Sequence, residues 1–244
     1  MDAVPPIASL DDPGSLAFRF AGIERRIQAA CERSGRVRTA VRLVGASKRQ
    51  PLPLLAAAYE LGLRCFGENR VQEAVAKAPE LPGDIEWHLL GPLQSNKIRK
   101  AVAICRVLHA VDRLGVALEI DAEAARQGRR VHGFVEVNLG AEDSKHGFAP
   151  EDLVATLESL AALEHLEIRG LMAIPPPGAR AEDSRPHFRR LAALRDELAR
   201  RPEWRARGFA GELSMGMSDD FDVAIEEGAT HVRIGSALFG ERPA

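Results

Sequence analysis

Lys48 is the residue whose position in this chain first indicates chemistry. It follows a short apolar segment, Val41–Ala46, and precedes Pro51, an order that predicts a strand, a loop and a helix start. On the two-residue period of a strand, Lys48 shares a face with Val44 and Ala46. If that face lines a barrel, loss of hydration lowers the pKa of the lysine and makes its amine a nucleophile toward aldehydes. The alternative is a rim lysine whose long side chain reaches water.

Two segments near the end of the chain contain the residue types that a phosphate group needs. Ser214, Met215 and Gly216 come at the end of one strand-like segment, and Gly235 and Ser236 follow the next. They supply hydroxyls and unobstructed backbone N–H groups at helix or turn starts, which bind a phosphate dianion. Ordinary tight turns use the same residue types, so the pattern alone leaves both interpretations open.

Arg233 has a position that requires a partner. Its neighbours Val232 and Ile234 are expected to face outer helices, so the arginine faces inward. A buried guanidinium needs an acceptor or a counter-charge. Glu212 or Glu136 on a neighbouring strand would make a structural ion pair. The ring nitrogen of a ligand is the other candidate, and a fixed positive charge keeps a pyridine nitrogen unprotonated.

The three features together indicate one cofactor. A nucleophilic lysine, a phosphate-binding segment and an inward arginine suggest pyridoxal 5′-phosphate (PLP), held on Lys48 as an internal aldimine. The alternative from chemistry alone is a Schiff-base aldolase, in which the same lysine and phosphate site serve a sugar phosphate.

The elements that must position these residues alternate along the chain. A helix at Ser15–Arg33 is followed by segments typical of strands and helices in turn. The predicted strands are Val41–Ala46, Arg64–Phe66, Glu86–Leu90, Arg106–Val111, Val131–Val137, Ile168–Ile174, Glu212–Met215 and His231–Ile234. The predicted helices between them are Pro51–Leu61, Arg70–Ala78, Leu93–Ile104, a helix capped by Asp112 that runs to Gln127, Glu151–Leu163, Ser184–Arg200 and Asp219–Glu227.

Eight strands with intervening helices favour a single closed α/β barrel of the (β/α)8 (TIM) type over an open doubly wound sheet. No G-x-G-x-x-G pattern follows the first strand, which argues against a dinucleotide fold. The given sequence stops about ten residues after the eighth strand, so we expect a full eighth outer helix to be missing and Ser15–Arg33 to fill the gap. The 244 residues suit one such barrel, with 1–14 as a loose tail and 15–244 as the domain.

Composition excludes several classes of protein. The net charge of −2 argues against binding to nucleic acid through bulk charge. No apolar run reaches the ~18 residues of a membrane span, and the first residues do not have the pattern of a secretory signal. The three cysteines, Cys31, Cys65 and Cys105, are expected to be reduced and buried rather than to form disulfides or a zinc site. These observations predict a cytoplasmic protein.

Seven motifs in order along the chain support a more specific assignment. They are Val44–Lys48, Phe66–Glu73, Trp87–Lys97, Val137-Asn138 with Ser144–Gly147, Gly170–Met172, Leu213–Asp219 and Val232–Gly240. From about residue 17 to 242 the chain resembles the YggS/PROSC family of PLP homeostasis proteins. The resemblance implies a PLP barrel of fold type III, related to the N-terminal barrel of alanine racemase but without its second, β-rich domain.

The resemblance also implies roles for individual residues. Lys48 matches the PLP-bound lysine, and Arg233 matches the residue that faces the pyridine nitrogen. Asn69, expected in a loop of Gly67, Glu68 and Asn69 after the second strand, matches a pocket residue near the ring. The segments at Ser214 and at Gly235-Ser236 match the phosphate-binding positions. Ser236 stands where threonine is common in the family, which preserves the hydroxyl, and Arg70 stands where an aromatic residue is common.

Racemase activity requires a second base, which the sequence does not supply. Lysine serves one face of the cofactor and tyrosine the other in alanine racemase-like sites, but Tyr59, the chain's one tyrosine, lies in a helix away from the strand ends. Four histidines are expected to be packed and hydrogen-bonded rather than catalytic, namely His88, His109, His132 and His231. We therefore expect a PLP carrier rather than a PLP-dependent racemase.

The family resemblance implies binding of PLP, its supply to apo-enzymes, a monomeric state and no established catalytic activity. Lys97 and Lys145 lie in family motifs, and we expect them to be surface lysines. The alternative is that they contact the aldehyde briefly during transfer.

Overall fold

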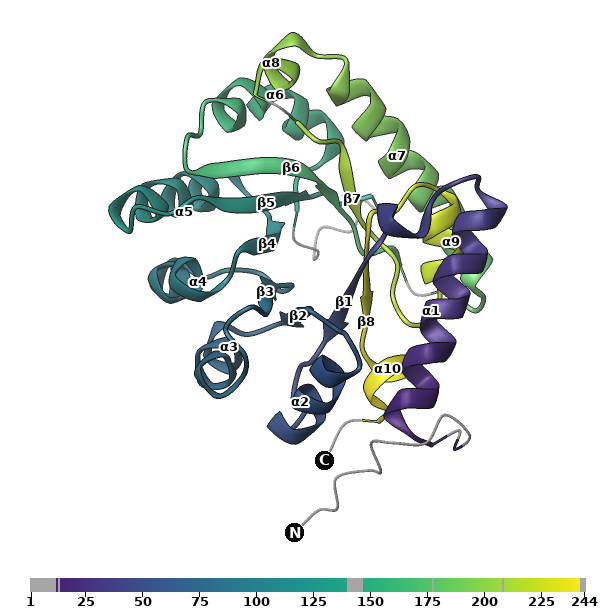
Figure 1. The fold of residues 1–244 in the computed structure, drawn as a ribbon. Helices are drawn as coiled ribbons and strands as arrows, with labels where there is room; N and C mark the ends of the chain where they lie inside the picture. The colour runs from purple at the N-terminus through teal and green to yellow at the C-terminus, as the bar shows by residue number, and fades with distance from the viewer. Residues whose placement is uncertain (1–11, 13, 140–146, 177, 208, 242–244) are drawn as a thin grey trace.

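The computed structural model describes residues 12, 14–139, 147–176, 178–207 and 209–241. Most of the predicted tail, residues 1–14, lies outside the described residues, as does Lys145. Eight parallel strands close into one barrel in chain order, with β8 paired to β1. The prediction of a (β/α)8 barrel is confirmed (Figure 1). The strands are β1 (Arg42–Ala46), β2 (Cys65–Glu68), β3 (Glu86–Leu89), β4 (Val107–Val111), β5 (Val131–Glu136), β6 (Leu166–Met172), β7 (Glu212–Ser214) and β8 (His231–Ile234).

Helices surround the strands as an outer layer (Figure 1). They are α1 (Leu16–Arg33), α2 (Leu52–Glu60), α3 (Val71–Lys77), α4 (Ile98–Ile104), α5 (Leu114–Arg126), α6 (Pro150–Ala161), α7 (Arg185–Ala199), α8 (Pro202–Ala206), α9 (Phe221–Glu226) and α10 (Ser236–Phe239). Short 3-10 turns occur at Arg38–Ala40, Ala78–Glu80, Ser95–Lys97 and Ala181–Ser184.

Four local predictions differ from the structure. The predicted helix Leu93–Ile104 begins only at Ile98, after the 3-10 turn at Ser95–Lys97. Strand β2 extends through Gly67 and Glu68, which were expected in a loop, because the pairing with β3 continues to Leu89. The N-cap of α5 is Arg113 rather than Asp112, and Asp112 pairs with the Arg113 side chain at 2.8 Å. Helix α8 was not predicted, because its five residues are too few to show a helical period.

Helix α1 fills the gap beside the short final helix, as predicted. Ser15 caps its N-terminus by accepting a hydrogen bond from Phe18 N at 3.1 Å. The helix packs against α9 and α10 (Figure 1), and Arg19 Nε donates to Leu238 O at 2.8 Å. Arg33 pairs with Glu226 at 2.7 Å. The N-terminal helix therefore completes the outer layer where α10 has only four residues.

The two faces of the strands have different compositions. Outward side chains join the main apolar core with the helices, as Leu43, Phe66 and Val232 do. The barrel interior contains smaller apolar groups, among them the cluster of Val107, Ala110, Phe134 and Met172. Three buried histidines also occupy the interior, namely His88, His109 and His231. Branched aliphatic residues usually dominate this position, so the polar interior is a specific property of this chain.

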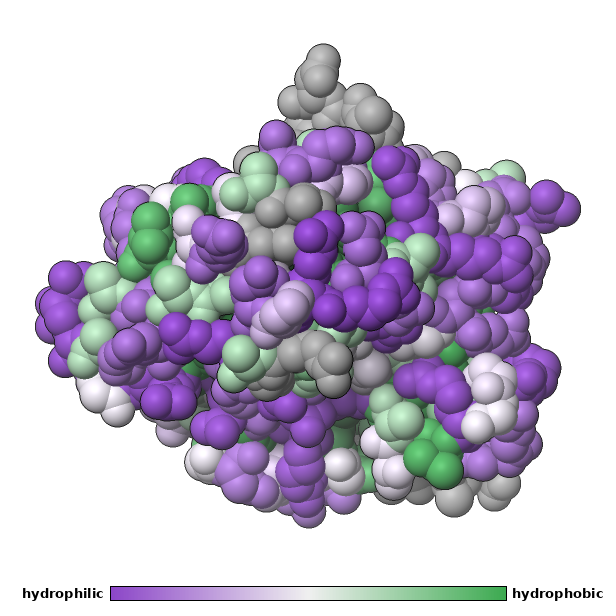
Figure 2. Space-filling view, turned by 90° about the horizontal axis from the view of Figure 1, so that it is seen from above, coloured by the Kyte–Doolittle hydropathy of each residue, from purple (hydrophilic) through white to green (hydrophobic). Residues whose placement is uncertain are grey.

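The outer surface is mostly hydrophilic. The face seen in Figure 2 shows scattered apolar residues among polar ones. The large apolar side chains that are exposed among the described residues are Val37, Leu118, Ile174 and Met217. No described helix combines the length and the apolar character needed to cross a membrane.

The packing of α1 generates a stability prediction. Ile27 is fully buried in the core, so Ile27→Ala removes packed methyl groups and should lower the free energy of unfolding by about 2–5 kcal/mol. Gly22→Ala is the matched control, because a Cβ there meets nothing within 4 Å and should stabilise the helix by up to ~1 kcal/mol. Urea unfolding monitored by circular dichroism measures both. Equal stabilities for the two variants would show that α1 is not part of the cooperative fold.

Candidate cofactor site

Lys48 lies just beyond the C-terminal end of β1, where active sites of such barrels are found. Its side chain is partly buried and lines a cavity of about 350 Å³. Asn69 and Lys97 line the same cavity, one after β2 and the other after β3. The structure therefore brings Lys48, Asn69 and Lys97 to the lining of one cavity.

A buried ion pair holds the residue before Lys48. Glu68 is 0% exposed and accepts hydrogen bonds from Lys77 Nζ and Ser47 Oγ, both at 2.7 Å. Lys77 Nζ also donates to Ser47 O at 2.9 Å. Burial raises the pKa of Glu68, and the hydrogen bonds from Lys77 and Ser47 act in the opposite direction. Both the hydroxyl and the carbonyl of Ser47 are thus fixed by groups inside the helix layer.

The residue after Lys48 is fixed as well. Arg49 N donates to Glu73 Oε2 at 2.7 Å, and Lys77 pairs with the same carboxylate at 3.6 Å. Arg49 has a φ of 60°, the left-handed conformation that non-glycine residues rarely adopt. The Glu68–Lys77–Glu73 cluster therefore holds the backbone on each side of Lys48 and sets the position of its side chain.

The loop that carries Asn69 packs directly against Gly91. A Cβ added to Gly91 would lie 2.5 Å from Asn69 O, so only glycine permits this close approach. Leu90 N donates to Glu68 O at 2.8 Å, immediately before this contact. Asn69 thus has a defined place at the edge of the cavity.

Ser218 and Ser236 form a hydroxyl pair between the ends of β7 and β8. Ser236 Oγ lies 3.2 Å from Ser218 Oγ, and Ala237 N donates to Ser218 Oγ at 3.3 Å. Ser218 also borders a larger cavity of about 780 Å³. Phosphate binds after strands seven and eight in many barrels. The segment Ser214–Ser218 was a phosphate candidate from the sequence, but Ser218 itself was not singled out there.

The predicted phosphate residue Ser214 lies elsewhere. Its hydroxyl is fully buried inside the barrel, 2.6 Å from Arg233 Nη1 and 2.7 Å from His109 Nδ1. The Ser214 hydroxyl is therefore engaged with Arg233 and His109, whereas Ser218 provides the hydroxyl beside Ser236. The physical reason is strand parity, which directs residue 214 into the barrel before the turn begins.

Three other predicted residues have structural roles. The Met215 side chain packs in the main core and its N–H donates to His231 O, so neither reaches the cavity. Gly216 has a φ of 92°, and a Cβ there would lie 2.6 Å from Ala224 Cβ. Gly235 lies against the end of β1, where an added Cβ would be 3.3 Å from Ala46 O. Gly235 thus brings Ser236 close to the strand that leads to Lys48.

Arg233 faces the barrel interior, as predicted, and only 6% of it is exposed. Its Nη1 donates to Ser214 Oγ, and its Nη2 donates to Ala173 O at 3.2 Å. Glu212, one of the two acidic partners expected for it, instead pairs with Arg169 at 2.9 Å. In the strand register, Arg233 lies opposite Val44 of β1.

His88, His109 and His231 are packed and hydrogen-bonded, as predicted, whereas no hydrogen bond of the His132 side chain is seen among the described residues. His88, His109 and His231 are buried in the barrel, and His132 lies 3.6 Å from Glu167. Tyr59 donates to Asp84 Oδ1 at 2.8 Å, near the start of β3 and therefore at the end of the barrel opposite Lys48.

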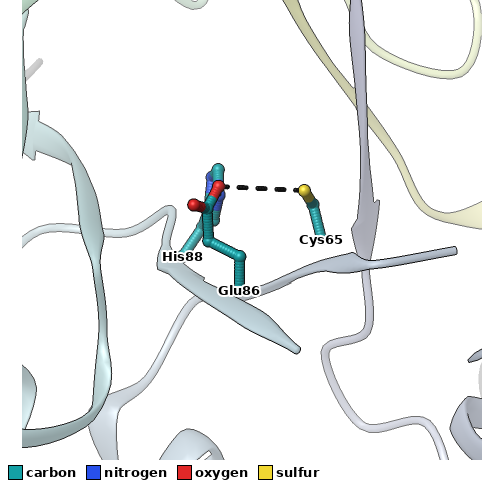
Figure 3. Close-up of side chains that lie close together, drawn as sticks. All are labelled: Cys65, Glu86 and His88. Carbon is teal, nitrogen blue, oxygen red and sulfur yellow. Dashed lines mark hydrogen bonds and ion pairs between the residues drawn. The ribbon is translucent and has the colours of Figure 1, made fainter. Parts of the chain in front are cut away.

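One close group was not expected from the sequence. Figure 3 shows Cys65, Glu86 and His88, whose ligand atoms lie within 4.8 Å of one another near the N-terminal ends of β2 and β3. His88 Nε2 is 2.9 Å from Glu86 Oε1, and the Cys65 thiol lies 3.8 Å from the same oxygen. Burial raises the pKa of Cys65 to about 11, so the thiol is protonated at neutral pH. Arg42 also donates to this carboxylate.

The chemistry of the donor groups fits PLP, with Lys48 lining the smaller cavity and Ser218 the larger one. The Lys48 amine suits the aldehyde, the Ser218–Ser236 hydroxyl pair suits the phosphate, and the buried guanidinium of Arg233 suits an unprotonated ring nitrogen. All of these groups come from β1, β7 and β8, which are neighbours in the closed barrel.

Fold and site together define a class of protein, the barrel of alanine racemase-like PLP proteins. The family model "Alanine racemase, N-terminal domain" matches residues 23–243. Alanine racemase of Clostridium difficile 630 has the same fold, with a TM-score of 0.65 at 17% identity, covering 94% of this chain and 57% of that one.

More similar relatives identify the family. A pyridoxal phosphate homeostasis protein of Aquifex aeolicus is 45% identical over 92% of this chain and 97% of its own length. The human pyridoxal phosphate homeostasis protein is 38% identical over 90% of this chain and 84% of its own length. The structure of PipY of Synechococcus elongatus with PLP bound matches with a TM-score of 0.80 and 38% identity, covering 93% of this chain and 100% of that one. The chain belongs to the pyridoxal phosphate homeostasis protein family.

The clamp around Lys48 generates a second prediction. Lys77→Met leaves the Glu68 carboxylate buried without its counter-ion and should lower the free energy of unfolding by about 3–5 kcal/mol. Lys100→Met, at an exposed position, is the matched control and should change it by less than ~0.5 kcal/mol. Urea denaturation measures both. Equal stabilities would contradict the assigned role of the ion pair.

The buried histidines generate a pH prediction. Burial lowers the pKa of His88 and places those of His109 and His231 well below the ordinary value of 6.5. The unfolded chain takes up these protons below about pH 6.5 and the folded chain does not, so stability should fall as the pH drops from 7 to 5. His231→Phe, which keeps a ring against Phe134, should reduce this slope by about 1.4 kcal/mol per pH unit. The free energy of unfolding is measured by urea titration at each pH. The same pH dependence in His231→Phe and the unmodified protein would contradict this prediction.

Proposed function

We propose that this protein binds PLP through Lys48 and takes part in controlling its supply inside the cell. The observation that carries the proposal is the Lys48 amine in a cavity with Asn69, held in place by the buried Glu68–Lys77 pair. Bound PLP supplies an aldehyde that forms a reversible covalent bond with an amine. PipY, 38% identical, has a structure with PLP bound, and the curated relatives are named for PLP homeostasis.

Each proposed binding residue has one task. Lys48 holds the aldehyde end, and Asn69 borders the ring at the cavity edge. Ser218 and Ser236 donate hydroxyl hydrogen bonds to the phosphate, with Gly235 leaving room for the approach of β1. Arg233 keeps the ring nitrogen unprotonated, because a second positive charge beside the guanidinium is unfavourable.

The proposed role is that of a carrier rather than a racemase. Racemisation needs a base on each face of the cofactor. The single tyrosine, Tyr59, is bonded to Asp84 beside the start of β3, and the three interior histidines are buried by packing. A covalent bond that forms reversibly in an accessible cavity allows other amines, including the lysines of apo-enzymes, to take the aldehyde.

The remaining parts of the proposal concern location and partners. We propose a cytoplasmic monomer that supplies apo PLP-enzymes. Cys31, Cys65 and Cys105 are free and buried, which suits a reducing compartment. Lys97, which lines the same cavity as Lys48, is proposed to contact the aldehyde during transfer.

Visible absorption tests the role of Lys48. The full chain loaded with PLP should show the absorption band of lysine-bound PLP, and Lys48→Ala should abolish it because the variant lacks the amine that is proposed to bond the aldehyde. Lys100→Ala, exposed on α4 and outside the cavity, is the control and should keep the band. Retention of the band in Lys48→Ala would assign the covalent bond to another residue.

Incubation of the loaded protein with L-alanine and other amino acids, followed by chiral analysis, tests the carrier role. Sustained racemisation would replace that role with the racemase alternative. Retro-aldol turnover of sugar phosphates would instead support the aldolase alternative.

A further inference from the structure

A chain of side-chain hydrogen bonds crosses the barrel from its far end to Arg233. Glu86 Oε1 lies 2.9 Å from His88 Nε2, and His88 Nδ1 lies 2.8 Å from His109 Nε2. His109 Nδ1 is 2.7 Å from Ser214 Oγ, which is 2.6 Å from Arg233 Nη1. The chain runs through β3, β4, β7 and β8, and joins groups far apart in sequence.

The middle of this hydrogen-bond chain is fully buried, whereas its Glu86 end is partly exposed to solvent. His88, His109 and Ser214 are each 0% exposed, whereas the Glu86 side chain is 23% exposed at the start of β3. Bulk solvent therefore contacts the Glu86 carboxylate, whereas the three residues between it and Arg233 have no solvent-exposed surface. Every polar group in between must be satisfied by its neighbours in the chain, because an unpaired buried donor or acceptor is costly.

The chemistry of the groups fixes the direction of every bond. A guanidinium only donates, so Ser214 Oγ accepts from Arg233. The ionised Glu86 carboxylate at the other end only accepts, so with two neutral imidazoles between them the Ser214 proton must go to His109 Nδ1. A neutral imidazole has one donor and one acceptor, so His109 Nε2–H donates to His88 Nδ1. His88 Nε2–H then donates to the Glu86 carboxylate. Both histidines are thereby assigned as neutral Nε2–H tautomers.

The charges around the chain agree with this direction. The hydrogen bond from His88 lowers the pKa of Glu86 to about 2, so the terminal acceptor is ionised. Burial lowers the pKa of Arg233 to about 10, which leaves it charged at neutral pH. The other groups that face the chain are Arg42 on β1, Arg106 before β4, Cys65 on β2, His231 on β8, and Asp220 and Glu136 near Arg233.

We propose that Glu86, His88 and His109 are positioning residues for the cofactor, acting through Ser214 on Arg233. The carboxylate orients both imidazoles, His109 orients the Ser214 hydroxyl as an acceptor toward the guanidinium, and the guanidinium is held for the ring nitrogen of PLP. The inference rests on the proposed function, in which Arg233 faces that nitrogen. Because Arg233 retains its proton at neutral pH, the chain orients groups and does not conduct protons.

A metal ion at Cys65, Glu86 and His88 is the competing use of the same groups (Figure 3). A metal on His88 Nε2 would move the proton of that ring to Nδ1 and reverse every bond as far as Ser214. Arg42 and Arg106 beside the Glu86 carboxylate oppose a second cation there. The two uses therefore predict opposite tautomers for the histidines.

Nuclear magnetic resonance of the cofactor-free full chain, labelled with ¹⁵N at histidine, tests the inference directly. At pH 7 the expected result is two neutral Nε2–H tautomers for His88 and His109. Glu86→Gln keeps a carbonyl acceptor and should preserve both tautomers. Glu86→Leu removes the acceptor and should change the His88 signal. A charged ring or an Nδ1–H tautomer in the unmodified protein would overturn the proposal.

The PLP-loaded protein supplies the second measurement. Glu86→Leu and Ser214→Ala should weaken PLP binding about tenfold, the effect of one misplaced charged hydrogen bond, and should shift the pH profile of the visible band upward. Glu86→Gln should restore most of the affinity. Tyr59→Phe, at the same end of the barrel but outside the chain, is the control and should change neither quantity.

The outcomes distinguish the two proposals. If the unmodified protein does not bind PLP through Lys48, the proposed function is wrong. The histidine tautomers would still test whether the hydrogen-bond chain has the proposed direction. Normal PLP binding with identical pH profiles in Glu86→Leu and the unmodified protein would overturn the positioning role alone. Calorimetry with Zn²⁺ tests the metal alternative. Zn²⁺ binding that is lost in Cys65→Ser would assign Cys65, Glu86 and His88 to a metal site and would also overturn the positioning role.

Discussion

The buried pair of Glu68 and Lys77 is the interaction on which the site depends. A fully buried carboxylate is tolerated because Lys77 and Ser47 both bond to it, and that requirement fixes the backbone before Lys48. Glu73 fixes the backbone after it. The clamp lies between β2 and α3 and leaves the cavity free, so the lysine is positioned from outside the barrel. The side chain that is proposed to carry the chemistry is thereby separated from the groups that support it.

The second constraint comes from inside the barrel, which is polar where most such barrels are aliphatic. A guanidinium without water needs acceptors, and the described structure supplies Ser214 Oγ and Ala173 O. Satisfying Ser214 in turn requires His109, and satisfying His109 requires His88. Each buried polar group therefore needs a further hydrogen-bond partner, until Glu86, whose carboxylate is partly exposed to solvent. A charged residue near one end of the barrel thus accounts for polar residues through its whole depth.

The sequence predicted much of this architecture because hydrophobic periodicity is a local property. All eight strands were placed within two residues at each end, and Ser15–Arg33 was correctly expected to complete the outer layer. The inward direction of Arg233 followed from strand parity alone. Strand β2 ends two residues later than expected, because its end depends on pairing with β3, a partner 21 residues away in sequence. Helix α8 is too short to have a period.

The sequence by itself determined the closed barrel, the lysine at its first strand end and the family. Only the tertiary structure decided which hydroxyl stands beside Ser236, because Ser214 and Ser218 have the same chemistry and differ in the direction that the turn gives them. The tertiary structure also decided the clamp and the hydrogen-bond chain. Their members come from different strands and helices, and barrel closure, a property of all eight strands together, is what brings them within bonding distance.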